Sequence, residues 1–190
     1  MSTARIGYAL CGSHCTLSRA IAEMRGLAAI GYEIVPIMST AARYTDTRFG
    51  SGDGFAEVIE DICKNKIIDT VREAEPLGPS SPLDALIIAP CTGNTLAKLA
   101  GGITDTAVTM AAKAHLRQDR PLVIALATND AMSQNLKSIA TLLQRKSVYF
   151  VPLCQDDPAG KPHSLVADFK KIPEALTAAM SGKQLRPLFI

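Results

Sequence analysis

Short runs of Val, Ile, Leu and Ala recur along the chain, and segments with helical spacing of apolar residues separate them. An apolar run of strand length is typical of a strand that is buried on both faces, as in parallel sheets. We therefore predict an α/β protein in three layers, with helices on both faces of a central, mainly parallel sheet. The predicted strands span residues 5–10, 33–38, 83–89, 121–127 and 147–152, and the predicted helices span residues 17–30, 55–64, 104–117, 131–145 and 164–180.

The length of 190 residues fits one domain, which we assign to residues 1–190. Two segments fit the alternating pattern poorly. Pro36 lies inside the second predicted strand, where it removes a backbone N–H. Residues 67–82 contain three prolines and a glycine near their end, so we predict a structured loop there rather than a helix.

Charge and hydropathy argue against nucleic-acid and membrane functions. The net charge is +2 and the Lys and Arg residues are scattered, so we expect no nucleic-acid groove. The apolar runs are well short of the roughly 20 residues of a membrane span, and the N-terminus lacks a signal-peptide layout. We therefore expect a cytoplasmic protein without disulfides. Cys11 and Cys15 have no second pair at zinc-site spacing, so we expect no metal.

Small and hydroxyl-bearing residues follow four of the predicted strands. Ligands of parallel sheets bind outside the carboxyl ends of the strands, so these residues form the predicted binding site. They are Gly12, Ser13, His14, Cys15, Thr16, Ser39, Thr40, Pro90, Cys91, Thr92, Gly93, Asn94, Thr95, Thr128 and Asn129.

Two of these loops, residues 11–16 and 90–95, lead into helical segments. Helix N-termini present unpaired N–H groups, so both loops are candidate anion sites that need no Lys or Arg. The alternative is that their Ser, Thr and Asn residues only cap helices. Four such loops at one edge of one sheet favour a ligand site.

The first loop lacks the full dinucleotide fingerprint. It reads Gly7-Tyr-Ala-Leu-Cys-Gly12, and Ser39 stands where an acidic residue would bind a ribose. An NAD site within this chain is therefore disfavoured. A mononucleotide with a terminal phosphate, such as FMN, fits the pattern better.

The segment Ala89–Asp105, APCTGNTLAKLAGGITD, resembles a motif of the flavoprotein family that includes phosphopantothenoylcysteine decarboxylase. The loops at Gly12-Ser13 and at residues 39–42 match that family's other flavin loops. The resemblance implies a Rossmann-like, flavodoxin-like fold and FMN held by these loops, often at a subunit contact within a trimer. The matching positions are Gly12, Ser13, Ser39, Thr40, Pro90, Thr92, Asn94 and Thr95.

The chain departs from the decarboxylases of that family at two places. Residues 67–84 contain no histidine, although those enzymes use one before the corresponding strand. Their substrate clamp is reduced here to Asn129 and Met132, without the Pro, the first Met and the Trp. A stand-alone FMN-dependent decarboxylase is therefore the alternative rather than the favoured function, and a non-catalytic scaffold is a weaker one.

A narrower resemblance, to the B subunits of dipicolinate synthase, covers nearly the whole chain. It is carried by residues 73–79, 112–117, 127–130, 149–158, 161–165 and 182–187 together with the loop at 89–95. It implies a role in endospore formation, in the cytoplasm of the mother cell. The implied reaction oxidises a dihydrodipicolinate-type precursor to pyridine-2,6-dicarboxylate, with NAD(P) on a partner A subunit. The implied assembly is a homo-oligomer based on trimers, with a dodecamer as one form.

For several side chains the sequence allows either a functional or a structural role. Cys91 is either a redox or flavin-contacting thiol or, as we favour, a small apolar filler. His14 either donates to a ligand or is a solvated loop residue, whereas His115 and His163 are expected to be structural or at the surface. Candidate partners for a dicarboxylate are Arg72, Lys98 and Arg117, and a candidate base is Glu73 or Glu75. The sequence assigns no catalytic residue.

Overall fold

The computed structural model describes residues 3–190 and contains one seven-stranded sheet. The strands are β1 (Arg5–Leu10), β2 (Glu33–Met38), β3 (Ala85–Cys91), β4 (Leu122–Thr128), β5 (Val148–Phe150), β6 (Leu153–Cys154) and β7 (Leu165–Ala167).

Strands β1 to β5 are parallel and lie in the order β2-β1-β3-β4-β5. This is the flavodoxin-like order, whose direction of winding reverses between β1 and β3, so the expected fold class is confirmed. The outer edge of β4 is shared between two partners. Its first half pairs with β5, and its last residues, Ala127 and Thr128, pair antiparallel with β7.

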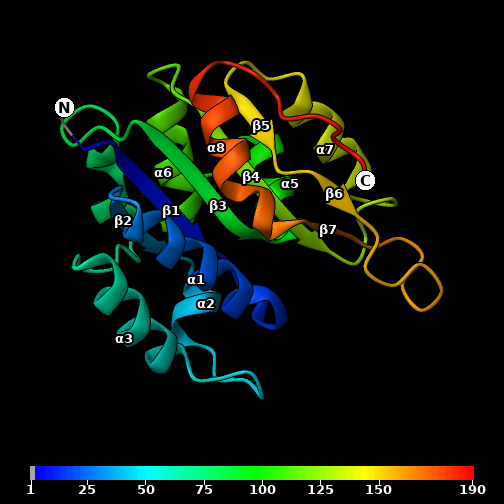
Figure 1. Cartoon of the computed structure of the whole chain (residues 1–190), viewed down its shortest axis with the longest axis horizontal. Helices are drawn as coiled ribbons and strands as arrows, with labels where there is room; N and C mark the ends of the chain where they lie inside the picture. Colours follow the sequence, from blue (N-terminus) through cyan, green and yellow to red (C-terminus); the bar gives the residue numbers. More distant parts are fainter. Residues whose placement is uncertain (1–2) are drawn as a thin grey trace.

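The helices form a layer on each face of the sheet (Figure 1). Helices α1 (His14–Ala29) and α8 (Ile172–Met180) cover one face, and the short helix α2 (Thr40–Tyr44) and α3 (Gly52–Cys63) pack beside α1 and the edge strand β2. The other face carries α4 (Val71–Ala74), the 3-10 helix η1 (Glu75–Leu77), α5 (Gly93–Gly101), α6 (Ala107–Leu116) and α7 (Leu136–Leu143). A second 3-10 helix, η2 (Phe169–Lys171), leads into α8.

The central strands are apolar on both faces because both faces are covered. All seven residues of β3 are buried, as are the last five of β1. The side chain of Tyr8 is fully buried, and its hydroxyl donates to the Ala20 carbonyl of α1 at 2.8 Å. This hydrogen bond satisfies the one polar group of a large core side chain and fixes α1 on the sheet.

The predicted strands at 5–10 and 33–38 match β1 and β2, including the position of Pro36. Pro36 is tolerated because β2 is an edge strand. The Pro36 carbonyl accepts from the Ile68 N–H at 2.9 Å, on the side away from β1. The nitrogen of a residue in a strand faces the same side as its carbonyl, so the missing N–H costs no bond to β1.

The prediction of a loop at residues 67–82 is wrong in part, because α4 and η1 lie within this segment. The Thr70 side chain caps α4 by accepting from the Glu73 N–H at 3.2 Å. Ala74 and Leu77 are buried, and these short helices pack on α6. Local capping and burial thus outweigh the prolines, two of which follow the last helical residue.

The last two predicted helices begin too early. Residues 165–167 form β7, because they complete the sheet beside β4 and β6, and α8 begins only at Ile172. Residues 129–134 turn around Asp130, whose carbonyl accepts from Ser133 N and Asn135 N, so α7 begins at Leu136. Sheet pairing distant in sequence explains the first error, and a local turn held by Asp130 explains the second.

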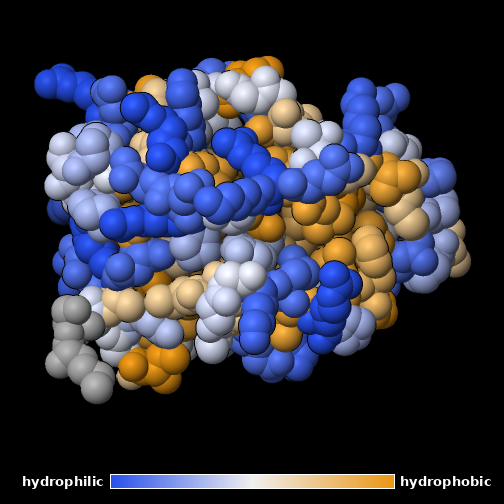
Figure 2. Space-filling model, turned by 90° about the horizontal axis from the view of Figure 1, so that it is seen from above, coloured by the Kyte–Doolittle hydropathy of each residue, from blue (hydrophilic) through white to orange (hydrophobic). Residues whose placement is uncertain are grey.

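No helix in residues 3–190 is both long and apolar enough to span a membrane. On the face shown in Figure 2, hydrophilic side chains cover much of the surface, and a broad apolar area lies in the right half of the view.

Candidate functional site

The loop after β1 carries the N-terminus of α1 to the switch point of the sheet. The Thr16 hydroxyl lies 2.9 Å from both the Ser13 carbonyl and the Ser13 hydroxyl, which closes the first turn. The backbone N–H groups of His14 and Cys15 have no hydrogen-bond partner among the described residues. Two donors at the positive end of a 16-residue helix are therefore free for a ligand.

The loop after β3 has the same construction. The Thr92 hydroxyl caps α5 by accepting from the Thr95 N–H at 3.3 Å. The N–H groups of Gly93 and Asn94 have no partner within residues 3–190. The two loops are joined, because the Cys11 N–H donates to the Pro90 carbonyl at 3.1 Å. Free donors from two helices consequently face the same edge of the sheet.

Ser39, after β2, acts as the N-cap of α2. Its buried hydroxyl accepts from the Ala42 N–H at 3.2 Å, and its own N–H donates to the Leu10 carbonyl. Thr40 is exposed beside it. For the Ser39 and Thr92 hydroxyls, capping is thus an observed role, and contact with a ligand is an additional one that remains a prediction.

The end of β4 is organised by Asp130, which follows the predicted strand in the sequence but is not among the predicted binding residues. Its Oδ1 atom accepts from the Thr128 hydroxyl and from Asn135 Nδ2, the latter at 2.7 Å. The Thr128 hydrogen bond, helped by that of Asn135, holds the pKa of Asp130 below its usual range. A Cβ at Gly93 would lie 2.5 Å from Asn135 Nδ2, so only glycine allows α5 to approach this cluster.

Two hollows lie at this edge and share Gly12 and Thr92 as a common wall. The β2-side pocket, of about 360 Å³, is lined by Gly12, Ser39, Thr40, Ala41, Thr92, Asn94, Thr95, Lys98 and Thr106. The arm-side pocket, of about 240 Å³, is lined by Gly12, Ser13, Cys15, Thr16, Arg19, Thr92, Gly93, Ala127, Thr128, Asn129, Asp156, Lys161 and Val166. We call residues 153–167 the arm; its loop projects from the sheet, in orange in Figure 1.

All predicted site residues except His14, Pro90 and Cys91 line one of these two pockets. Pro90 and Cys91 are the last residues of β3, and both are buried. His14 is the first residue of α1, and its buried Nδ1 atom has no hydrogen-bond partner among residues 3–190.

The thiols at the switch point are protonated and are therefore poor nucleophiles. Burial raises the pKa of Cys11 to about 11, and burial also raises the pKa of Cys91 well above its usual value. Cys91 therefore fits the role of a small filler. No cluster of three or more His, Cys, Asp or Glu side chains suited to a metal occurs within the described residues.

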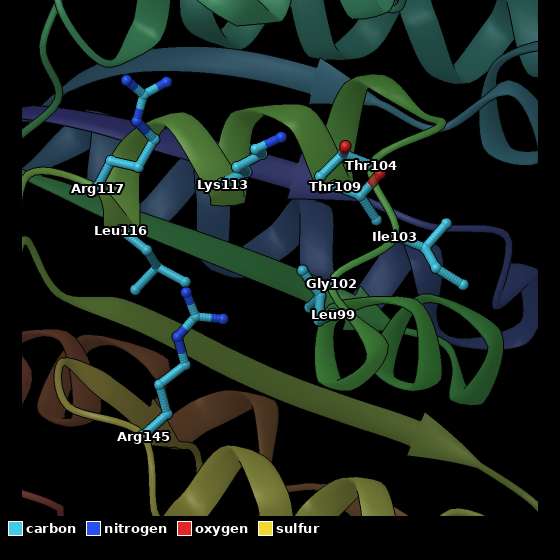
Figure 3. A pocket seen from close by; sticks show the side chains of 9 residues that line it. All are labelled: Leu99, Gly102, Ile103, Thr104, Thr109, Lys113, Leu116, Arg117 and Arg145. Carbon is cyan, nitrogen blue, oxygen red and sulfur yellow. The ribbon is translucent and has the colours of Figure 1, made fainter.

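The candidate dicarboxylate partners are not brought together. Lys98 lines the β2-side pocket and pairs with Asp105 at 2.7 Å. Arg117 lines a different cavity of about 280 Å³ between α5 and α6, where Figure 3 shows Arg117 at the end of α6 and Arg145 extending toward Leu116. Arg72 lies on α4, and Glu73 and Glu75 belong to α4 and η1, so none of these three lines the pockets at the strand ends.

Three charged residues of the arm-side pocket were not predicted from the sequence. Asp156 and Lys161 belong to the arm, which antiparallel pairing with β4 and a bond from the Met132 N–H to the His163 carbonyl bring to the pocket. Arg19 could have been found, because it follows Cys15 by one helical turn. Placing the start of the first helix at Leu17 instead of His14 concealed that relationship.

The fold and the crevice together define a class: a flavodoxin-like α/β protein with free helix N-termini at the switch point of its sheet. The chain belongs to the Flavoprotein family, whose model matches residues 1–179. Both the family and the likeness to the B subunits of dipicolinate synthase were expected from the sequence, and similarity to known proteins confirms both.

The B subunit of dipicolinate synthase from Bacillus subtilis is 41% identical over 186 residues, which covers 98% of this chain and 93% of that protein. The crystal structure of the corresponding B subunit from Bacillus halodurans has a TM-score of 0.91 and 40% identity, covering 100% of this chain and 98% of that one. A dodecameric FMN-dependent UbiX-like decarboxylase from Escherichia coli O157:H7 shares the fold, with a TM-score of 0.64, 23% identity, and coverage of 78% and 79%.

Proposed function

We propose that this chain is the B subunit of a dipicolinate synthase. The observation that carries the proposal is the 41% identity over 98% of the chain to the Bacillus subtilis protein. In the proposed reaction, a dihydrodipicolinate-type precursor loses a hydride and a proton and becomes pyridine-2,6-dicarboxylate. NAD(P)⁺ on a partner A subunit accepts the hydride.

The residues at the strand ends fit FMN as a cofactor. Four backbone N–H groups at the starts of α1 and α5 are free, and His14 Nδ1 is buried without a partner in the described chain. We propose that the loops at residues 12–16, 39–40 and 92–95 would hold the phosphate-bearing flavin. When bound, FMN would supply a centre that accepts and returns electrons.

The proposed division of labour with an A subunit is supported by the end of β2. An NAD site has an acidic residue there for the ribose, and an NADP site has an arginine nearby for the 2′-phosphate. Ser39 occupies that position, and its buried hydroxyl already caps α2. NAD(P) is therefore assigned to the partner, and this chain contributes the crevice for the small dicarboxylate.

The assembly and location are part of the same proposal. A homo-oligomer based on trimers, up to a dodecamer, would bury exposed apolar side chains such as Ile103 and Leu136. The E. coli protein of the same fold is itself dodecameric. We place the protein in the cytoplasm of the mother cell of a sporulating bacterium.

The alternative function is a stand-alone FMN-dependent decarboxylase. The fold agrees with it, but the histidine and most of the substrate clamp of those enzymes are absent. Segment 67–84 has no histidine, and it folds into α4 and η1 rather than lining either pocket. We therefore expect no CO₂ release from phosphopantothenoylcysteine or from a peptidyl C-terminal cysteine.

The test is reconstitution with the A subunit and freshly prepared dihydrodipicolinate, following NAD(P)H and pyridine-2,6-dicarboxylate together. We expect both products to form at a substantial rate only when both subunits are present. Equal rates with the A subunit alone would remove the proposed role of this chain. The visible spectrum of the purified protein checks the flavin separately, because bound oxidised FMN colours the protein yellow.

A further inference from the structure

Arg19 stands over an aromatic ring at the wall of the arm-side pocket. Its guanidinium carbon lies 5.0 Å from the centroid of the Phe169 ring. Arg19 belongs to α1, whereas Phe169 belongs to η2, directly after the arm. The contact therefore connects the first helix of the chain with the segment that completes the sheet beside β4.

Phe169 holds the arginine from a fixed position. Its side chain is fully buried, and the Asp168 side chain caps η2 by accepting from the Lys170 N–H. A guanidinium stacked on an immobile ring keeps its N–H groups free at its edge. The stack also reduces the rotamer freedom that Arg19 would otherwise lose when it binds a ligand.

The charge of Arg19 is not neutralised within the described chain. None of the ion pairs among residues 3–190 includes Arg19, whereas Arg5 and Arg43 each contact a carboxylate. The other cation of the pocket, Lys161, pairs with Asp156 at 3.2 Å, and Asp156 also accepts from the Ser164 hydroxyl. Three further acidic residues lie nearby: Asp130 accepts from Thr128 and Asn135, Asp157 belongs to the arm loop, and Asp168 caps η2; none of them forms an ion pair in the described residues.

Arg19 is therefore the cation of this pocket that has no ion-pair partner among the described residues, whereas Lys161 pairs with Asp156. The free N–H groups at the starts of α1 and α5 lie at the wall of the same pocket. An arginine edge matches the two oxygens of a carboxylate in a bidentate pair. The volume of about 240 Å³ admits a small organic anion.

We propose that Arg19, positioned by Phe169, binds a carboxylate of the substrate and makes the arm-side pocket selective for small planar dicarboxylates. The second carboxylate is then received by Lys161, because the N–H groups at the start of α5 are assigned to the flavin phosphate. This inference rests on the proposed function, because it names the residue that recognises the substrate class.

The test measures binding of pyridine-2,6-dicarboxylate and pyridine-2-carboxylate to the full chain by titration calorimetry. The variants are Arg19→Leu, Arg19→Lys, and Arg25→Leu as a matched control. Arg25 is an exposed arginine of the same helix that lines neither pocket at the strand ends. We expect Arg19→Leu to weaken binding of the dicarboxylate about tenfold to a hundredfold. Arg19→Lys should recover part of the loss, and Arg25→Leu should bind as wild type does.

Equal affinity in wild type and Arg19→Leu, or no measurable binding by wild type, would overturn the assignment. The variant Phe169→Leu, chosen for its apolar bulk, should weaken binding less than Arg19→Leu; its melting temperature reports whether it still folds. Failure of the proposed function is distinguishable. In that case reconstitution with the A subunit produces no NAD(P)H, while binding of the dicarboxylate still depends on Arg19.

Discussion

The Thr95 hydroxyl donates to the Cys11 sulfur at 3.3 Å, and this bond joins the first turn of α5 to the end of β1. Both residues are buried. The strand ends on either side of the switch point are therefore linked through side chains as well as through the Cys11–Pro90 backbone bond. Such linkage holds the two free helix N-termini in a fixed relationship, which reduces the cost of binding an anion between them.

The first prediction concerns Gly93. Gly93→Ala would place a methyl group 2.5 Å from Asn135 Nδ2 and 2.6 Å from the Thr128 hydroxyl. We expect a loss of about 1–3 kcal/mol in unfolding free energy, because the Asp130 cluster must move. Chemical denaturation measures it. Gly101→Ala is the matched control on the same helix, since the nearest contact of its added methyl group would be 3.9 Å away. An equal loss of unfolding free energy in Gly101→Ala would contradict the explanation through the Asp130 cluster.

The second prediction concerns Asn94, which is exposed at the start of α5 and lines the β2-side pocket. Asn94→Leu removes an amide that both donates and accepts. We expect FMN binding to weaken by about 1–3 kcal/mol, with little change in melting temperature, because the side chain makes no hydrogen bond within residues 3–190. Fluorescence titration with FMN provides the affinity. A variant that binds flavin normally would exclude Asn94 as a ligand, and one that only unfolds would make it a structural turn residue.

The third prediction follows from the protonated thiol of Cys11, whose pKa burial raises from 9.0 to about 11. The unfolded chain releases this proton at lower pH than the folded chain does. The contribution of the protonated Cys11 thiol to the free energy of unfolding is therefore fully present below pH 9. It is lost as the pH rises toward 11, by about 2–3 kcal/mol.

Urea denaturation between pH 8 and pH 11 measures this dependence. Cys11→Ala should lower stability at neutral pH and flatten the decrease above pH 9. The same slope in both proteins would assign the decrease to Cys63, Cys91 and Tyr8, whose pKa values burial also raises.

The fourth prediction concerns Asp130, which accepts hydrogen bonds from Thr128 and Asn135. Its pKa is lowered below 3.8, chiefly by the Thr128 hydrogen bond. Its contribution to stability is therefore present above pH 3.8 and is lost as the pH falls through the pKa of the folded state. Asp130→Ala should cost about 1–2 kcal/mol at neutral pH and progressively less in acid. A loss that does not change with pH would mean that packing, and not the ionised carboxylate, is what matters.

The parallel core and the edge at which the site lies could both be predicted from local composition. Strands such as β1 and β3 are apolar throughout because both faces are covered, and that composition is visible without coordinates. Small residues after each strand then locate the crevice, and the long motif at residues 89–105 identifies the family.

The division of the crevice and its charge, in contrast, depend on contacts that form only when the chain folds. Asp156 and Lys161 reach it because the arm pairs antiparallel with β4, and such pairing depends on contacts distant in sequence that no local period encodes. Likewise, the sequence does not show which of Arg117 and Arg19 can reach a carboxylate in the crevice. Arg117 lies in a separate cavity between α5 and α6, whereas Arg19 rests on Phe169, about 150 residues away along the chain, because burial of that ring fixes where a guanidinium can stack.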